Sequence, residues 1–68
     1  MNAKEIGKRI KDLRKAAKLT QEQLAERLNV SKAYLAHVEI GDKIPSIDLF
    51  VDMASFFNTS LDFLILGK

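Results

Sequence analysis

The side chains best suited to contact a partner gather at the start of one short predicted helix. They are Ser31, Lys32, Ala33, Tyr34 and His37. Lys32 can donate to guanine O6 and N7, His37 can donate to or accept from a base edge, and Ala33 can contact a thymine methyl group. Ser31 is a further candidate for base contact, whereas Tyr34 suits a phosphate or a sugar. The chemistry of these residues is compatible with contacts to a nucleic acid, but any one of them alone is weak evidence, and His37 could also be an exposed histidine without a role.

Two further residues are candidates for contacts with a nucleic-acid backbone. Gln21 begins a predicted helix, where its amide and the free backbone N–H groups can hold a phosphate. Lys43 lies in a predicted loop and either pairs with a phosphate or is merely solvated. Basic residues of the first predicted helix would raise the electrostatic potential nearby without specifying a base. They are Lys4, Lys8, Arg9 and Lys11.

Catalysis and metal binding have few candidate residues. The chain has no cysteine and one histidine, which excludes a thiolate site and a structural zinc site. Its three glycines are isolated, so there is no glycine-rich phosphate loop, and no pair of carboxylates stands out for acid–base chemistry. Ser31 and Ser46 are predicted helix caps rather than nucleophiles. We expect no enzymatic activity, no cofactor, no metal and no small-molecule ligand.

Two short helices must position the candidate nucleic-acid contacts. The first is predicted over residues 21–28, because Thr20 and Gln23 have the spacing of a capping box. Asn29 tolerates the left-handed conformation that ends a helix, and Ser31 caps a second helix that runs to about residue 39. A joint of about three residues holds two such helices near a right-angle crossing. Their predicted inward positions are Leu24, Ala25, Leu28, Val30, Leu35 and Val38.

Three more helices complete the prediction. They cover about residues 3–17, 47–57 and 61–66, and each follows an Asn or Ser with N-cap character. Gly7 inside the first helix suggests a close contact with another helix, since glycine lowers helix stability by about 1 kcal/mol relative to alanine. Spacing in the fourth helix predicts an apolar stripe of Ile47, Phe50, Val51, Ala54 and Phe57. The sequence thus predicts a compact all-α fold of five helices.

Length and charge limit the organisation of the chain. Its 68 residues suffice for one domain, and 47% hydrophobic with 29% charged residues is typical of a globular protein. Residues 1–18 carry seven basic side chains against Glu5 and Asp12, whereas residues 46–68 carry three acidic against one basic. This asymmetry suggests an anionic partner or only a solvated basic face. No apolar run reaches the ~20 residues of a membrane span and no signal peptide is evident, so we expect a cytoplasmic protein.

The sequence resembles the Cro/CI-type helix-turn-helix family, which has the lambda-repressor-like fold. The matching segments are Ile6–Arg14, Leu19–Ala25, Val30, Ser31, Glu39, Gly41, Pro45, Ser46 and Ser60–Leu64. The resemblance implies a single five-helix domain over residues 1–68, with a central helix-turn-helix at residues 21–40. It also implies a bacterial or phage protein that binds double-stranded DNA, usually as a two-fold dimer on a palindromic operator. Gln21 would then contact a phosphate, and residues 31–39 would form the recognition helix in the major groove.

Two charged residues are expected to have a structural role. Arg14 and Glu39 match family positions that pair across the first and third helices. Glu39 lies in the last turn of its helix, where an unpaired carboxylate opposes the helix dipole. A guanidinium partner would remove that penalty. We therefore predict an Arg14–Glu39 ion pair that orients the recognition helix.

Departures from the family pattern suggest a dimer. Ile40 stands where a polar residue is usual, and Ile44 stands where Asn is common. The last helix contains four consecutive apolar residues, more than one buried face can absorb. A homodimer interface is therefore predicted at Ile40, Ile44, Phe63, Leu64 and Leu66. Ordinary core filling with scattered exposed apolar residues is the alternative.

Together these patterns predict a transcriptional regulator of repressor type that recognises its DNA sequence through residues 31–39. The rival function is a helical protein-interaction module that has kept the fold and lost DNA binding. The modest net charge leaves that rival open, as do Ala33 and Ala36, which offer few hydrogen bonds to a base. The salt dependence of binding to random duplex separates the two, since phosphate contacts weaken steeply with added salt.

Overall fold

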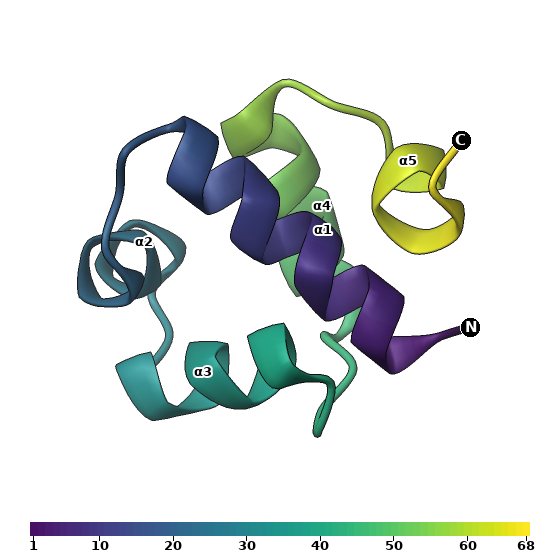
Figure 1. The fold of residues 1–68 in the computed structure, drawn as a ribbon. Coiled ribbons are helices and arrows are strands. Elements are labelled where there is room, and N and C mark those ends of the chain that lie inside the picture. The colour runs from purple at the N-terminus through teal and green to yellow at the C-terminus, as the bar shows by residue number, and fades with distance from the viewer.

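The computed structural model describes residues 1–68 and contains five α-helices. They are α1 (Ala3–Ala16), α2 (Gln21–Leu28), α3 (Lys32–Ile40), α4 (Ile47–Phe57) and α5 (Leu61–Leu66). In Figure 1, α1 crosses the centre of the molecule with α4 behind it. The other three helices lie around this pair, with α5 beside the N-terminus and α2 on the opposite side. The predicted all-α, five-helix fold is confirmed.

Side-chain caps explain where the helices begin. Asn2, Thr20, Ser31, Ser46 and Ser60 each precede a helix and accept a hydrogen bond from the backbone N–H three residues later. Each cap satisfies one of the N–H groups that lack a partner inside the helix. At Thr20 the capping box is complete, because Gln23 Oε1 also accepts from the Thr20 N–H at 2.9 Å. The predicted helix starts are therefore confirmed.

Left-handed residues explain where four of the helices end. Asn29, Gly41, Asn58 and Gly67 all have positive φ and follow α2, α3, α4 and α5 respectively. This conformation turns the chain out of the helix and pairs the last free carbonyl groups. The helix α3 extends one residue beyond the predicted end, through Ile40.

All five helices contribute to one apolar core. Its buried residues are Ile6, Ile10, Leu24, Ala25, Leu28, Leu35, Val38, Leu49, Phe50, Met53 and Leu64. Half-buried side chains such as Leu13, Val30 and Tyr34 pack against it. None of the helices has the length and apolar character needed to cross a membrane.

The predicted close approach at Gly7 occurs between α1 and α3. A side-chain carbon on Gly7 would overlap the backbone carbonyl oxygens of Val38 and Glu39. Backbone atoms of α3 cannot swing aside as a flexible side chain can. Gly7 therefore sets how closely the last turn of α3 packs against α1.

The predicted apolar stripe of α4 is wrong in part. Phe50 is buried, but Leu49 and Met53 accompany it in the core, while Ile47 and Val51 are exposed. The helix α4 is apolar on most of its surface, so spacing alone does not select the buried face. Packing against α5 and α2 selects it instead.

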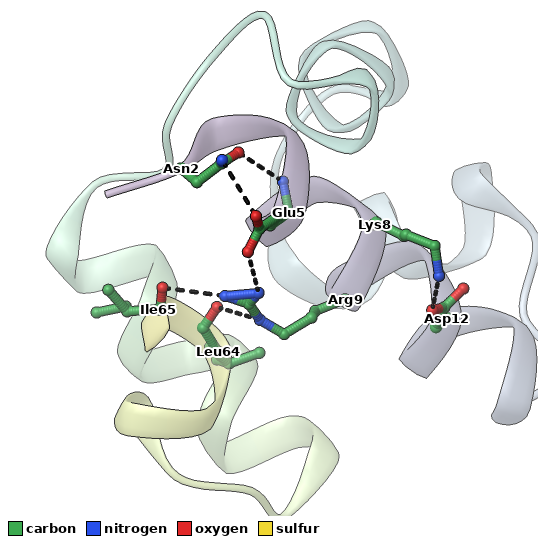
Figure 2. Close-up of polar contacts among 7 residues, drawn as sticks. All are labelled: Asn2, Glu5, Lys8, Arg9, Asp12, Leu64 and Ile65. Atoms are coloured by element: carbon green, nitrogen blue, oxygen red, sulfur yellow. Dashed lines mark hydrogen bonds and ion pairs between the residues drawn. The ribbon is translucent and has the colours of Figure 1, made fainter. Parts of the chain in front are cut away.

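An unpredicted contact fastens α5 to α1. Arg9 Nε donates to the carbonyl of Leu64 at 3.3 Å, and Arg9 Nη2 donates to that of Ile65 at 3.1 Å. Glu5 lies 3.8 Å from the same guanidinium group (Figure 2). Carbonyls at the end of a helix lack intrahelical partners, and a cation there also suits the helix dipole. Arg9 thus holds the short α5 in place, whereas the neighbouring Lys8 pairs with Asp12 on the exposed side.

Candidate nucleic-acid interface

The candidate interface is built on the turn between α2 and α3. Asn29 has φ 60° and ψ 43°, and the N–H of Val30 donates to the Ala25 carbonyl at 2.9 Å. These features reverse the chain within three residues. Ala25 is buried in the core, where a small side chain lets the helices approach. The other predicted inward positions are also buried, except Val30, which is half-buried against the core.

The turn leaves the start of α3 open to solvent. Ser31, Lys32 and Ala33 are exposed at the N-terminal end of the helix. Tyr34 is half-buried because part of its ring packs against the core. His37 follows one turn later and is exposed. Four of the five predicted contact residues therefore lie at the N-terminal end of α3, with Tyr34 at the edge of the exposed area, whereas His37 lies in the last turn of the helix.

A buried ion pair connects α1 to the other end of α3. Arg14 Nε lies 2.7 Å from Glu39 Oε2, and Arg14 Nη2 lies 3.0 Å from Glu39 Oε1. The geometry is bidentate, which makes it strong and directional. Hydrogen bonding to Glu39 raises the pKa of Arg14, although burial opposes this shift. The predicted Arg14–Glu39 pair is present in the structure.

Two further hydrogen bonds complete this polar cluster. Gln21 Nε2 donates to Glu39 Oε1 at 3.0 Å, and Arg14 Nη1 donates to the Leu19 carbonyl at 2.8 Å. No buried side-chain nitrogen or oxygen of the protein lacks a partner. The cluster therefore ties together α1, the start of α2 and the end of α3. The Gln21–Glu39 bond was not predicted, because nothing in the spacing of these residues indicates it.

Gln21 keeps donors for a phosphate despite this bond. Its amide nitrogen has two hydrogens, of which Glu39 accepts one. The backbone N–H of Gln21, like others in a first helical turn, has no partner inside the helix. Glu39 thus orients the amide at the helix start, where an anion is favoured.

The loop after α3 contains Lys43, which was predicted to contact the DNA backbone, and Asp42, which makes an unpredicted contact within the protein. Lys43 is exposed in this loop, as the prediction requires. Asp42 Oδ2 lies 3.1 Å from His37 Nδ1. The loop carboxylate therefore contacts one of the predicted base-contacting residues. A separation of five residues between a helix and a loop carries no recognised sequence signal. This contact is therefore known only from the structure.

The predicted dimer residues differ in exposure. Ile40, Ile44 and Leu66 are 62%, 45% and 59% exposed, whereas Phe63 is half-buried. Leu64 is 0% exposed and belongs to the core, so its assignment to an interface between subunits is wrong. One face of α5 fills the core, and Leu64 is the residue at its centre.

Residues 10–64 match the helix-turn-helix family, and this span includes α2, α3 and the turn between them. The chain belongs to the Cro/CI-type helix-turn-helix family. The match leaves out only the first part of α1 and the last residues of the chain.

Regulators from Bacillus and its phages resemble this chain. The HTH-type transcriptional regulator ImmR of Bacillus subtilis is 36% identical over 63 residues, which are 93% of this chain and 49% of that protein. The immunity repressor protein of Bacillus phage phi105 is 52% identical over 42 residues, which are 62% of this chain and 29% of that protein. The chain therefore spans about half, or less, of the length of these relatives.

A protein of comparable size with a solved crystal structure has the same fold. The restriction-modification controller protein C.AhdI from Aeromonas hydrophila superposes with a TM-score of 0.83 at 27% identity. The alignment covers 93% of this chain and 96% of that chain. The five-helix arrangement around a helix-turn-helix is therefore shared over almost the whole of both chains.

Proposed function

We propose that this helix-turn-helix protein binds double-stranded DNA in a sequence-specific manner and regulates transcription as a repressor. The observation that carries the proposal is the Arg14–Glu39–Gln21 cluster, which holds the end of α3 against α1 and α2 while the start of α3 is exposed. The cluster holds α3 at a set angle to α1 and α2, with its polar N-terminal end outward. A helix held in this way can enter a major groove, as recognition helices do.

Different residues would supply specificity and attachment. Ser31, Lys32, Ala33 and His37 meet base edges in this proposal, so they determine which sequence is bound. Gln21, Tyr34 and Lys43 contact the DNA backbone, so they set the position of the protein on the duplex. The basic side of α1 adds attraction for DNA of any sequence. The protein acts by binding alone, without catalysis.

The protein would act as a homodimer on a palindromic operator. Apolar side chains are exposed on the end of α3, on the α3–α4 loop and on α4 and α5. The most exposed are Ile40, Ile44, Ile47, Val51 and Leu66. Ile47 and Val51 are four residues apart and thus share one face of α4. A two-fold axis through this surface would pair identical patches and present two α3 helices to successive major grooves. We place the protein in the cytoplasm of a bacterium, either as its own regulator or as one encoded by a phage.

Selection of bound duplexes from a random pool tests this function. We expect a palindrome with half-sites about one helical turn apart, or 34–36 Å. Lys32→Ala and His37→Ala should each lower affinity for the selected site by about 5- to 100-fold and relax preference at one base pair. Lys68→Ala serves as the matched control, since Lys68 lies at the C-terminus away from α3 (Figure 1).

Salt dependence adds a second measurement. Affinity for random duplex should fall steeply with salt, as expected when several phosphate contacts release counterions. Failure to bind any duplex at low salt would contradict the proposal and favour a protein-interaction module. Loss of affinity in Lys68→Ala equal to that in Lys32→Ala would contradict the assignment of α3 as the recognition helix.

A further inference from the structure

His37 is the only histidine of the chain, and its ring makes one polar contact. Nδ1 lies 3.1 Å from Asp42 Oδ2, and both side chains are more than half exposed. An ionised carboxylate accepts hydrogen bonds and donates none. The hydrogen in this bond therefore belongs to His37 Nδ1.

The position of this hydrogen determines what the rest of the ring can do. In a neutral imidazole, one nitrogen carries the hydrogen and the other is an acceptor. Because Asp42 holds the hydrogen on Nδ1, Nε2 of neutral His37 is the acceptor. Nε2 has no hydrogen-bond partner within the protein and lies across the ring from the carboxylate. Nε2 of neutral His37 is therefore an acceptor that is free to bind a partner outside the protein.

Base edges in the major groove differ in whether they can donate a hydrogen bond to an acceptor. Cytosine N4 and adenine N6 donate hydrogen bonds there, whereas guanine offers acceptors only and thymine offers an acceptor and a methyl group. We propose that Asp42 is a specificity-determining residue that makes His37 select cytosine or adenine over guanine or thymine. This inference rests on the proposed function, since it requires His37 to face a base edge.

The charge of Asp42 has a separate effect on binding. A carboxylate near the DNA backbone weakens binding to every sequence by a similar factor, because phosphates are the same at each step. Removal of Asp42 should therefore raise overall affinity whether or not Asp42 acts on His37. The preference among the four base pairs at one position separates the two effects.

The hydrogen position can be measured in the free protein. Long-range proton–nitrogen NMR spectra at about pH 8.5, where a histidine ring is ordinarily neutral, report which nitrogen carries the hydrogen. We expect Nδ1 to carry it in the unsubstituted protein, and Nε2 to carry it in a substantial fraction of Asp42→Ala molecules. Asp52→Ala, which removes an exposed carboxylate on α4, should leave the spectrum unchanged. A hydrogen on Nε2 in the unsubstituted protein, in a neutral or a charged ring, would overturn the inference.

Base preference is measured on the selected operator. His37→Ala identifies the base pair that His37 reads, and the four base pairs are then compared at that position at about pH 8.5. We expect cytosine or adenine on the contacted strand to be preferred by about fivefold, which a single hydrogen bond can supply. In Asp42→Ala this preference should shrink to less than about twofold, whereas Asp52→Ala should retain it.

The outcomes separate this inference from the proposed function. Binding with an unchanged preference in Asp42→Ala, a preference for guanine, or no base pair affected by His37→Ala would overturn the inference alone. Absence of binding to any duplex would overturn the proposed function and the inference with it. The NMR measurement needs no DNA, so it reports the hydrogen position on His37 independently of base preference.

Discussion

At the scale of single residues, Glu39 has the most consequential position. Its carboxylate is buried and accepts hydrogen bonds from Arg14 and Gln21. A buried charge is costly unless it is paired, so the partners of Glu39 are needed for the fold as well as for the site. Gln21 pairs with Glu39 and still has a free amide hydrogen, which the proposed function assigns to a phosphate.

Removal of one partner of the Arg14–Glu39 ion pair should strongly destabilise the protein. We expect Arg14→Ala to lower the free energy of unfolding by about 3–5 kcal/mol, because it leaves the Glu39 carboxylate buried without its main partner. Replacement of both residues by Met and Leu should cost much less. Urea unfolding measures both variants. A loss below about 1 kcal/mol for Arg14→Ala would show that water replaces the guanidinium group.

The pH dependence of this pair follows from the raised pKa of Arg14. A group whose pKa is raised by folding contributes its full stabilisation below the unfolded value and loses it as pH rises through the folded value. Both values lie in the strongly alkaline range for arginine. The stabilisation that comes from the charge of Arg14 should therefore be constant across neutral pH.

At the level of the helices, the contact between α1 and α3 sets the position of α3, the proposed recognition helix. Helix propensity predicts that Gly7→Ala stabilises α1 by about 1 kcal/mol. We expect the opposite, a net loss of about 1–3 kcal/mol, because the new carbon overlaps the α3 backbone at Val38 and Glu39. Urea unfolding and DNA affinity should both decline. A more stable Gly7→Ala protein would contradict the close packing.

The attachment of α5 should depend on Arg9 in a similar way. Arg9→Ala removes two hydrogen bonds to the end of α5, so we expect about 1–3 kcal/mol of lost stability. Amide hydrogen exchange should accelerate first in α5, since this helix has only six residues. Lys8→Ala is the matched control, because the exposed Lys8–Asp12 pair contributes at most a few tenths of a kcal/mol. Equal exchange in the two variants would contradict this role for Arg9.

At the scale of the whole molecule, the exposed apolar surface bears on assembly. In Figure 1 the α3–α4 loop and α5 lie on the side away from α2. The start of α3, which carries most of the proposed DNA contacts, and the apolar surface thus occupy different parts of the protein. This separation would let one subunit bind DNA and a partner subunit at the same time.

A charge placed in the apolar surface tests the dimer. We expect Ile47→Glu to shift the protein towards monomer in sedimentation experiments, because pairing would bury a carboxylate without a partner. It should also lower affinity for the palindrome more than for a single half-site. Ala16→Glu adds the same charge at an exposed position of α1 and should leave the assembly unchanged. A monomer at high micromolar concentration in the unsubstituted protein would contradict the proposed dimer.

Local interactions made much of this protein predictable. The starts of all five helices follow from caps that bond to an N–H three residues away. The turn between α2 and α3 follows from the tolerance of Asn29 for positive φ. Arg14 and Glu39 could be paired because the family pattern joins them, although they are 25 residues apart.

Local sequence patterns therefore specify the helices, their caps and the short joint that makes a helix-turn-helix, since these depend on neighbours along the chain. Helix packing, by contrast, determines which side of α4 is buried, that Leu64 belongs to the core, and that Arg9 holds α5 across 55 residues of sequence. It also brought Asp42 to His37. Apolar helices and long charged side chains each have several possible partners, and packing of all five helices around one core selects among them.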